Sequence, residues 1–259
     1  MDEKMSLFVY NTETQSVNRP ATPPPVETGD HFQNLLEREA ANWSLQNREP
    51  VVGWYDAHNA DKNEELLFRG APIMQGKLAL EYGCGPGRNL IKFRNYFRQI
   101  DGADRSPGIL SKVPLNLGDA GVPVPDLYLT DGHSLPMITN DTYDVVFSLI
   151  CMQHISARQW RLELYKEFFR VLKPGGFFCF QMGYGPGHNH SVDYFHEFDP
   201  SDNPDVRVEN VADLKKDIED TGFVDFDHIF TEPCHDLHHS GFGYDARNPS
   251  KVDRPSWKH

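Results

Sequence analysis

The feature of this sequence that most restricts its fold is a series of short apolar runs that alternate with helical patterns between residues 77 and 182. The run YDVVFSLI, residues 143–150, is almost continuously apolar, as expected of a central strand that is covered on both faces. This alternation predicts an α/β fold with a doubly wound, mostly parallel sheet. The expected strands are 77–82, 99–103, 127–130, 143–150 and 176–182, and the expected helices between them are 88–96, 109–117 and 157–172.

The chain around this region predicts peripheral segments rather than a second large domain. A long interruption at residues 184–207 reads as a lid-like insertion after the fifth strand, and a helix at 208–222 and a strand near 225–231 follow it. Beyond Ser240 the sequence is polar and glycine-rich, so the last strand of the sheet is either short or replaced by an irregular end. The expected divisions are a mobile Pro-rich tail (1–30), an N-terminal helical cap (31–70), the main domain (71–245) and a C-terminal tail (246–259).

The charge balance excludes some classes of partner. The chain has 25 Lys and Arg against 38 Asp and Glu, a formal net charge of -13, which repels phosphate backbones and anionic membranes. We therefore expect neither nucleic acid nor a membrane as a partner. The N-terminus lacks the apolar core of a signal peptide and the cysteines form no CxxC pair, so a cytoplasmic protein with reduced thiols is expected.

A glycine-rich turn follows the first apolar run, in the sequence EYGCGPG from Glu81 to Gly87. Glycines allow the backbone to approach a ligand, and the following helix presents free N–H groups, although the same pattern also occurs in plain tight turns. The spacing is GxGxG and not the GxGxxG that favours a dinucleotide pyrophosphate. Glu81 beside the turn would repel phosphate and attract a cation.

Further acidic residues follow the next two expected strands. Asp104 can accept both hydrogen bonds of a ribose diol, or it can cap a helix instead. Asp131 can bind the exocyclic amine of adenine, and Leu149 lies at the mouth of the central strand. Each of these signals is ordinary by itself, but their order and spacing along the chain are not.

With these motifs the chain resembles the class I S-adenosylmethionine-dependent methyltransferases. The matching segments are EYGCGPGRN, IDGADRSPGIL, TDGHSLP, YDVVFSLICMQHI and LYKEFFRVLKPGGFFCFQM, over about residues 75–183, with a weaker match at 208–231. The resemblance implies a Rossmann-like methyltransferase fold and S-adenosyl-L-methionine as cofactor. It implies that Glu81 faces the methionyl amine, that Gly83 and Gly85 let the protein backbone approach the cofactor, and that Leu149 touches the methionine moiety. It also implies that Asp104 holds the ribose hydroxyls and that Arg105 lies against the adenine face. Asp131 and Gly132 would then reach the adenine edge.

Methyl transfer from a sulfonium is an in-line displacement, so the protein mainly positions the acceptor and excludes water. A general base is needed only where the acceptor retains a proton. His154, just after the central strand, is our candidate for this role, and a packing or capping histidine is the alternative reading. An aromatic and histidine-containing enclosure favours a small organic acceptor, whose methylated atom (O, N or C) stays open; its expected wall residues are Trp54, Tyr55, Tyr184 and His188.

Histidines are crowded near the C-terminus, where the run CHDLHH occupies residues 234–239. On a strand His235 and His238 would face opposite sides, so we expect no metal site there. Two other functions compete with methyl transfer. One is a non-catalytic binding module on a cofactor fold, and the other is a nicotinamide-dependent oxidoreductase, which the GxGxG spacing and Glu81 disfavour.

Overall fold

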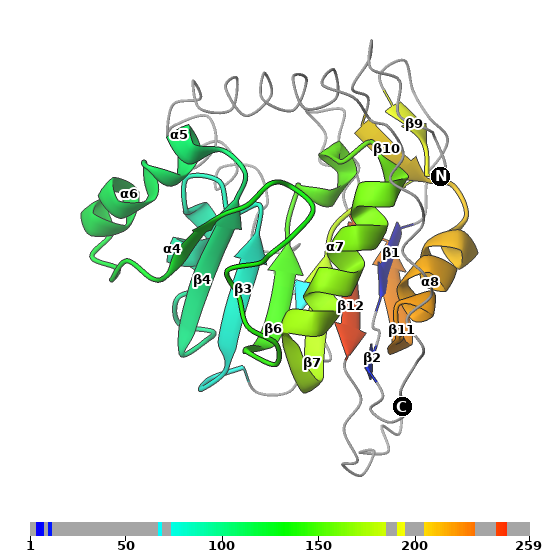
Figure 1. Ribbon diagram of the computed structural model, residues 1–259, viewed down its shortest axis with the longest axis horizontal. Helices are drawn as coiled ribbons and strands as arrows, with labels where there is room; N and C mark the ends of the chain where they lie inside the picture. Colours follow the sequence, from blue (N-terminus) through cyan, green and yellow to red (C-terminus); the bar gives the residue numbers. More distant parts are fainter. Residues whose placement is uncertain are drawn as a thin grey trace.

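A computed structural model of the protein describes residues 4–7, 10–11, 67–68, 74–184, 191–194, 205–230 and 242–247. Nine strands of these residues form one sheet in the order β2-β11-β1-β12-β7-β6-β3-β4-β5 (Figure 1). Five of them pair in parallel and confirm the alternation expected from the sequence. They are β3 (Leu78–Tyr82), β4 (Gln99–Asp104), β5 (Leu127–Leu129), β6 (Tyr143–Ser148) and β7 (Leu172–Phe180).

The helices that connect these strands also follow the expected pattern, with one difference. The helix expected at 109–117 is divided into α5 (Pro107–Leu110) and α6 (Val113–Asp119). Pro114 explains the break, because proline has no N–H to donate to the preceding turn and is tolerated at the start of a helix. The remaining helices are α4 (Arg88–Lys92), the 3-10 helix η1 (Met152–His154), α7 (Arg158–Val171) and α8 (Val211–Asp220).

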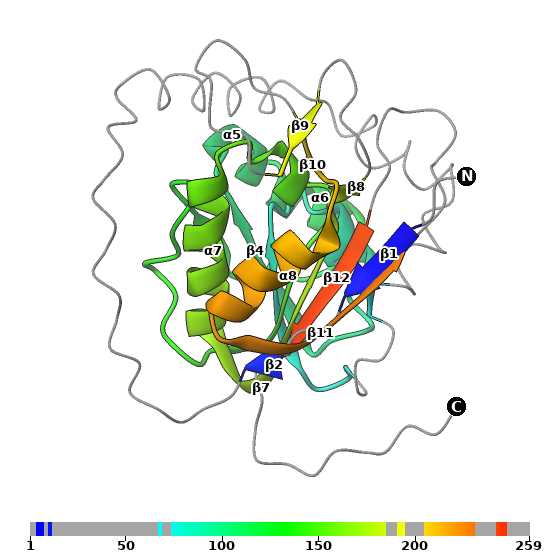
Figure 2. The same cartoon turned by 90° about the vertical axis from the view of Figure 1, so that its right-hand side faces the viewer.

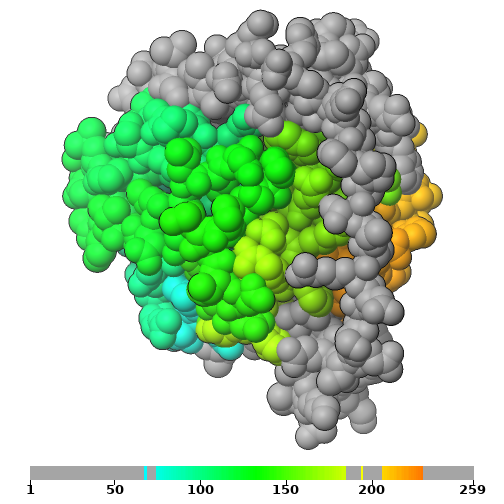
Figure 3. Space-filling view, viewed as in Figure 1, coloured from blue at the N-terminus to red at the C-terminus, as the bar shows by residue number. Residues whose placement is uncertain are grey.

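The sheet is covered on both faces, as the apolar run at 143–150 predicts. Val146 of β6 packs in one core with residues of α7 and α8, which lie on the same face of the sheet (Figure 2). Its neighbours Val145 and Phe147 belong to a second core, on the face of α4 and α6. This division follows from the period of two in a strand, which turns consecutive side chains to opposite faces. Figure 3 shows residues 100–150 and α7 as one continuous surface.

The far half of the sheet corrects two expectations about the chain ends. Residues in the expected mobile tail form β1 (Lys4–Leu7) and β2 (Tyr10–Asn11), both antiparallel to β11 (Phe223–Phe230). Strand pairing satisfies backbone N–H and C=O groups and does not require apolar side chains. The polar composition of the N-terminal segment therefore gave no sign that it forms strands. β12 (Phe242–Arg247) lies inside the sheet, antiparallel to β7 and β11, so a last strand is present in place of an irregular end, and it enters the expected C-terminal tail.

Described parts of the expected insertion at 184–207 form a second, small sheet. It contains β8 (Gly183–Tyr184), β10 (Asp205–Val208) and β9 (Ser191–Asp193) in that order. Val206 and Val208 are buried in the same core as α7, so this sheet is packed on the main domain. The expected helical cap is described at residues 67–68 alone, and the rest of it lies outside the described residues. In the part of the chain that the structure describes, no helix is long and apolar enough to cross a membrane.

Candidate functional site

The site lies where the strand order of the sheet changes direction. From β3 the chain proceeds outward to β4 and β5, whereas β6 and β7 lie on the other side of β3. In open α/β sheets ligands bind outside the carboxyl ends of the strands at such a point. The carboxyl ends of β3 and β4 lie at the upper edge of the sheet in Figure 1. A pocket of about 220 Å³ opens at these strand ends. Its wall includes the turn after β3, the end of β4 and the segment after β6.

Most of the residues expected to bind a cofactor meet in this pocket. Those that line it are Glu81, Gly83, Gly85, Asp104, Arg105, Gly132 and Leu149, and His154 joins them. Asp131 and Tyr184 are not among the lining residues. Trp54, Tyr55 and His188 lie outside the described residues, so the expected acceptor wall remains a prediction.

The glycine turn has the conformation and the close packing that require glycine. Gly83 and Gly85 have φ angles of 74° and 54°, in the left-handed region that side chains disfavour. A Cβ atom on Gly83 would lie 2.4 Å from the Cys151 sulfur, so nothing larger than hydrogen fits there. A Cβ on Gly85 would meet no atom within 4 Å. Because Gly85 lines the pocket, this open space is where a ligand can approach the backbone.

Glu81 has the electrostatics of a site for a cation. Its side chain is fully buried, and its Oε1 accepts a hydrogen bond of 2.5 Å from Asn89 Nδ2. Its Oε2 has no hydrogen-bond partner among the described residues. Burial raises the pKa of Glu81 to about 8, against a usual 4.5, because a carboxylate without water or a full set of donors is poorly stabilised. An ammonium group in the pocket would supply the missing charge and donor.

Asp104 is oriented by the backbone of the two adjoining turns. Its Oδ2 accepts from Gly85 N and its Oδ1 from Ser106 N, both at 2.9 Å. Each carboxylate oxygen can accept a second hydrogen bond, so the group can still bind a diol. Burial raises its pKa, and these backbone bonds oppose the rise. The alternative role of helix cap belongs to Ser106 instead, whose hydroxyl accepts from Ile109 N.

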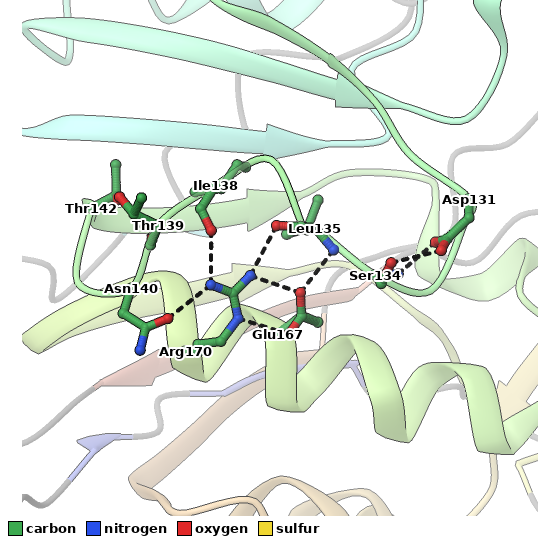
Figure 4. Close-up of polar contacts among 9 residues, drawn as sticks. All are labelled: Asp131, Ser134, Leu135, Ile138, Thr139, Asn140, Thr142, Glu167 and Arg170. Carbon is green, nitrogen blue, oxygen red and sulfur yellow. Dashed lines mark hydrogen bonds and ion pairs between the residues drawn. The ribbon is translucent and has the colours of Figure 1, made fainter.

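Asp131 shapes its own loop instead of facing the pocket. Its carboxylate accepts hydrogen bonds from the Ser134 N–H at 2.7 Å and the Ser134 hydroxyl at 2.6 Å (Figure 4). It also accepts from His133 N at 3.0 Å. Partial burial raises the pKa of Asp131, but these hydrogen bonds lower it by more, so the pKa lies below its usual value. The turn that they stabilise presents the next residue, Gly132, to the pocket, and the Gly132 carbonyl accepts from Tyr82 Oη at 2.8 Å.

The rest of this loop is attached to α7 by two charged side chains. Glu167 accepts from Leu135 N at 2.8 Å, and Arg170 donates to the carbonyls of Leu135 and Ile138 and to the Asn140 side chain (Figure 4). Arg170 and Glu167 also pair with each other. The loop that carries Gly132 is therefore held at both ends, and the edge of the pocket is fixed before any ligand arrives.

The structure adds pocket residues that the sequence analysis did not assign. Trp160 is buried in the first turn of α7 and lines the pocket, with its ring centre 5.9 Å from the Arg105 guanidinium. Its place near the start of a helix that begins at the carboxyl edge of the sheet was the sequence signal that could have assigned it to the pocket. Cys151 lines the pocket too, and burial raises its pKa to about 12, so it acts as wall and not as a nucleophile.

His154 lies in η1 and lines the pocket, so it can reach a molecule bound there. His133 has its Nδ1 2.9 Å from Glu163 Oε2 and its ring 4.4 Å from that of Trp160. The residues that the structure describes contain no group of His, Cys, Asp and Glu side chains able to hold a metal ion. The histidine run at 234–239 lies outside them.

Comparisons with known proteins find methyltransferases. Residues 79–176 match the family model of a methyltransferase domain. A tRNA (carboxymethyluridine(34)-5-O)-methyltransferase of Saccharomyces cerevisiae is 29% identical over 114 residues, 42% of this chain and 38% of that protein. A probable S-adenosylmethionine-dependent methyltransferase of Mycolicibacterium smegmatis is 26% identical over 175 residues, 66% of this chain and 59% of that protein. The chain thus spans less than two thirds of either relative.

Among solved structures, phosphoethanolamine N-methyltransferase 2 of Haemonchus contortus, in complex with phosphomonomethylethanolamine and S-adenosylhomocysteine, has the same fold. It is 16% identical, the TM-score is 0.55, and the match covers 85% of this chain and 61% of that one. The matched domain coincides with the strands and turns that form the pocket, from β3 to the start of β7. The fold, the site and these matches together show that the chain is similar to the S-adenosylmethionine-dependent methyltransferases over residues 79–176, the span of the methyltransferase domain model.

Proposed function

We propose that this protein transfers a methyl group from S-adenosyl-L-methionine to a small organic acceptor. The observation that carries the proposal is the unpartnered, buried Glu81 Oε2 beside the open space over Gly85, in a pocket at the switch point of the sheet. This arrangement fits a ligand with an ammonium group that lies against the backbone. When bound, the cofactor supplies a sulfonium methyl group that an acceptor atom can attack in line.

Different side chains of the pocket suit different chemical groups of the cofactor. Glu81, oriented by Asn89, would accept from the ammonium group, and the remaining acceptor positions of Asp104 would take the ribose hydroxyls. Arg105, Trp160 and Gly132 converge at one end of the pocket: a Cβ on Gly132 would lie 3.2 Å from the Arg105 guanidinium and 3.3 Å from the Trp160 ring. A flat nucleobase fits such an end better than a bulky group. Leu149, which is buried, would exclude water from the methionine side.

His154 is the residue we assign to the acceptor. It lies in the same pocket wall as Cys151 and Ser156, on the segment after β6. A neutral imidazole in that position would take the proton from an acceptor that still carries one. An acceptor without such a proton would need no base, and His154 would then only orient it.

The net charge supports a small acceptor over a polynucleotide. The yeast relative is named as a tRNA methyltransferase, but this chain has a formal charge of -13, and tRNA binding depends on neutralising phosphates. An acidic surface would raise the cost of bringing a polyanion near the pocket. A small, uncharged or cationic acceptor does not meet this repulsion.

The experiment has two steps. Calorimetry with S-adenosylhomocysteine and with NAD tests the cofactor, and we expect binding of the first alone. Transfer of a labelled methyl group from S-adenosylmethionine is then followed into total tRNA and into a library of small alcohols, amines and phenols. Label in the small-molecule fraction supports the proposal. Label in tRNA would refute the assigned acceptor class, and tight binding of NAD would refute the assigned cofactor.

A further inference from the structure

Arg161 is a fully buried arginine that no carboxylate neutralises in the described part of the chain. It is 0% exposed and lies in the first turn of α7. No ion pair joins it to an acid among the described residues, and burial lowers its pKa. Its neighbour Arg158, by contrast, forms a bidentate pair with Asp217 of α8, at 3.0 and 2.5 Å. Burying a charge without a counter-ion costs free energy, and hydrogen bonds to the charged group offset part of this cost.

Among the described residues, Arg161 donates to three backbone carbonyls that belong to two separate segments. One terminal nitrogen donates to Ile155 O at 2.5 Å and to Ser156 O at 2.9 Å. The other donates to Tyr194 O at 2.5 Å, and the guanidinium lies 4.8 Å from the centre of the Tyr194 ring. The planar, forked guanidinium can serve both directions at once, which a lysine cannot.

The first of these segments is the wall of the cofactor pocket. Ile155 and Ser156 both line it, directly after His154. They form the short link between η1 and α7, in which Ile155 N donates to Met152 O and the carbonyls of Ile155 and Ser156 both accept from Arg161. Arg161 therefore helps to fix the direction of these two carbonyls, which directly follow His154.

The second segment belongs to the small sheet. Tyr194 directly follows β9, is 2% exposed, and packs in the core with Met152 of η1 and Val206 of β10. The small sheet lies at the same end of the molecule as the start of α7 (Figure 2). It does not line the pocket. Beside this direct packing of the small sheet against η1, Arg161 connects the sheet to the pocket wall through the Tyr194 carbonyl.

We propose that Arg161 is a positioning residue that couples the small sheet at β9 to the cofactor-pocket wall at Ile155 and Ser156. Binding in the pocket orders the wall, and Arg161 transmits that order to Tyr194. The inference rests on the proposed cofactor site, but the coupling itself does not depend on which acceptor is methylated.

The test compares Arg161→Met, Arg161→Lys and the wild type by amide hydrogen exchange, with and without S-adenosylhomocysteine. In the wild type we expect the ligand to protect residues 83–85, which line the pocket, and also residues 191–194, which do not. In Arg161→Met the protection at 83–85 should remain and that at 191–194 should disappear. The dissociation constant should rise by about three- to thirtyfold, the range of coupling energies between linked sites. Arg161→Lys should recover only part of the remote protection, because one ammonium cannot hold three carbonyls in two directions.

Arg158→Met is the matched control, since it removes a neighbouring arginine that anchors α7 to α8. It should lower global stability but leave the ligand-induced protection at 191–194 intact. Remote protection that persists in Arg161→Met, or that is lost equally in Arg158→Met, would overturn the proposal. So would full recovery by lysine. If the wild type bound no S-adenosylhomocysteine, the proposed function would fail, and the unliganded exchange rates of 152–156 and 191–194 would still decide whether Arg161 holds both segments.

Discussion

Replacing Glu81 by Gln should stabilise the ligand-free protein and weaken its cofactor binding at the same time. The pKa of Glu81 is raised to about 8 in the folded protein, chiefly by burial. A carboxyl group whose folded pKa is raised favours folding at low pH, and this contribution is lost as the pH rises through the folded value. Glutamine keeps the shape and the acceptor for Asn89, but it has no proton to lose.

The size of the effect follows from the two pKa values, 4.5 unfolded and about 8 folded. The free energy of unfolding of Glu81→Gln should exceed that of the wild type by about 1 kcal/mol at pH 5, about 3 kcal/mol at pH 7 and about 5 kcal/mol at pH 9. Urea denaturation of both proteins at these three pH values, without ligand, measures the difference. A difference that does not grow with pH, or a variant less stable than the wild type at pH 9, would refute the reasoning.

Cofactor binding should change in the opposite direction. The free carboxyl is mostly protonated at pH 7 and must lose its proton to pair with an ammonium group. Calorimetry in two buffers of different ionisation enthalpy should therefore show proton release when S-adenosylhomocysteine binds to the wild type, and none in Glu81→Gln. The affinity of the variant should be about 10- to 100-fold lower, the value of a hydrogen bond between charged groups. Equal affinities would show that Glu81 does not face the ammonium group.

Three other changes test separate parts of the site. Gly83→Ala should unfold or severely destabilise the protein in thermal denaturation, because its Cβ would lie 2.4 Å from the Cys151 sulfur; a normal melting temperature would contradict this packing. Asp104→Ala should weaken S-adenosylhomocysteine binding in calorimetry by about 1–3 kcal/mol, whereas unchanged affinity in a folded variant would remove the ribose assignment. Arg170→Ala should lower the free energy of unfolding in urea by about 1–3 kcal/mol, since it leaves the Leu135 and Ile138 carbonyls without this donor; no loss would mean that the loop is held by other contacts.

The central part of the fold was predictable because its signals are local. Each signal depends on a few consecutive residues: the apolar run at 143–150, the glycine turn after β3 and the acidic residue at the end of β4. The topology of parallel strands then brings these ends to one edge, so most of the cofactor residues could be named from the sequence. The strands β1 and β2 gave no such signal, because pairing with the distant β11 satisfies their backbones and needs no apolar pattern.

Asp131 and Arg161 show why the finer roles at the site could not be predicted in the same way. An acid after β5 at the pocket edge has the right position for a ligand, but the Ser134 and His133 donors three and two residues later satisfy it first. The sequence shows those neighbours, but it does not show whether the Asp131 carboxylate binds them or a ligand. Arg161 reads as one more charged residue in an amphipathic helix. Its role depends on the carbonyls of Ile155 and Tyr194, which are 39 residues apart in the sequence and meet only after β7 and the small sheet have folded. Contacts of a side chain with a distant backbone leave no residue pattern, because any residue supplies a carbonyl. Positioning residues of this kind therefore have to be found in structures, and their coupling has to be measured.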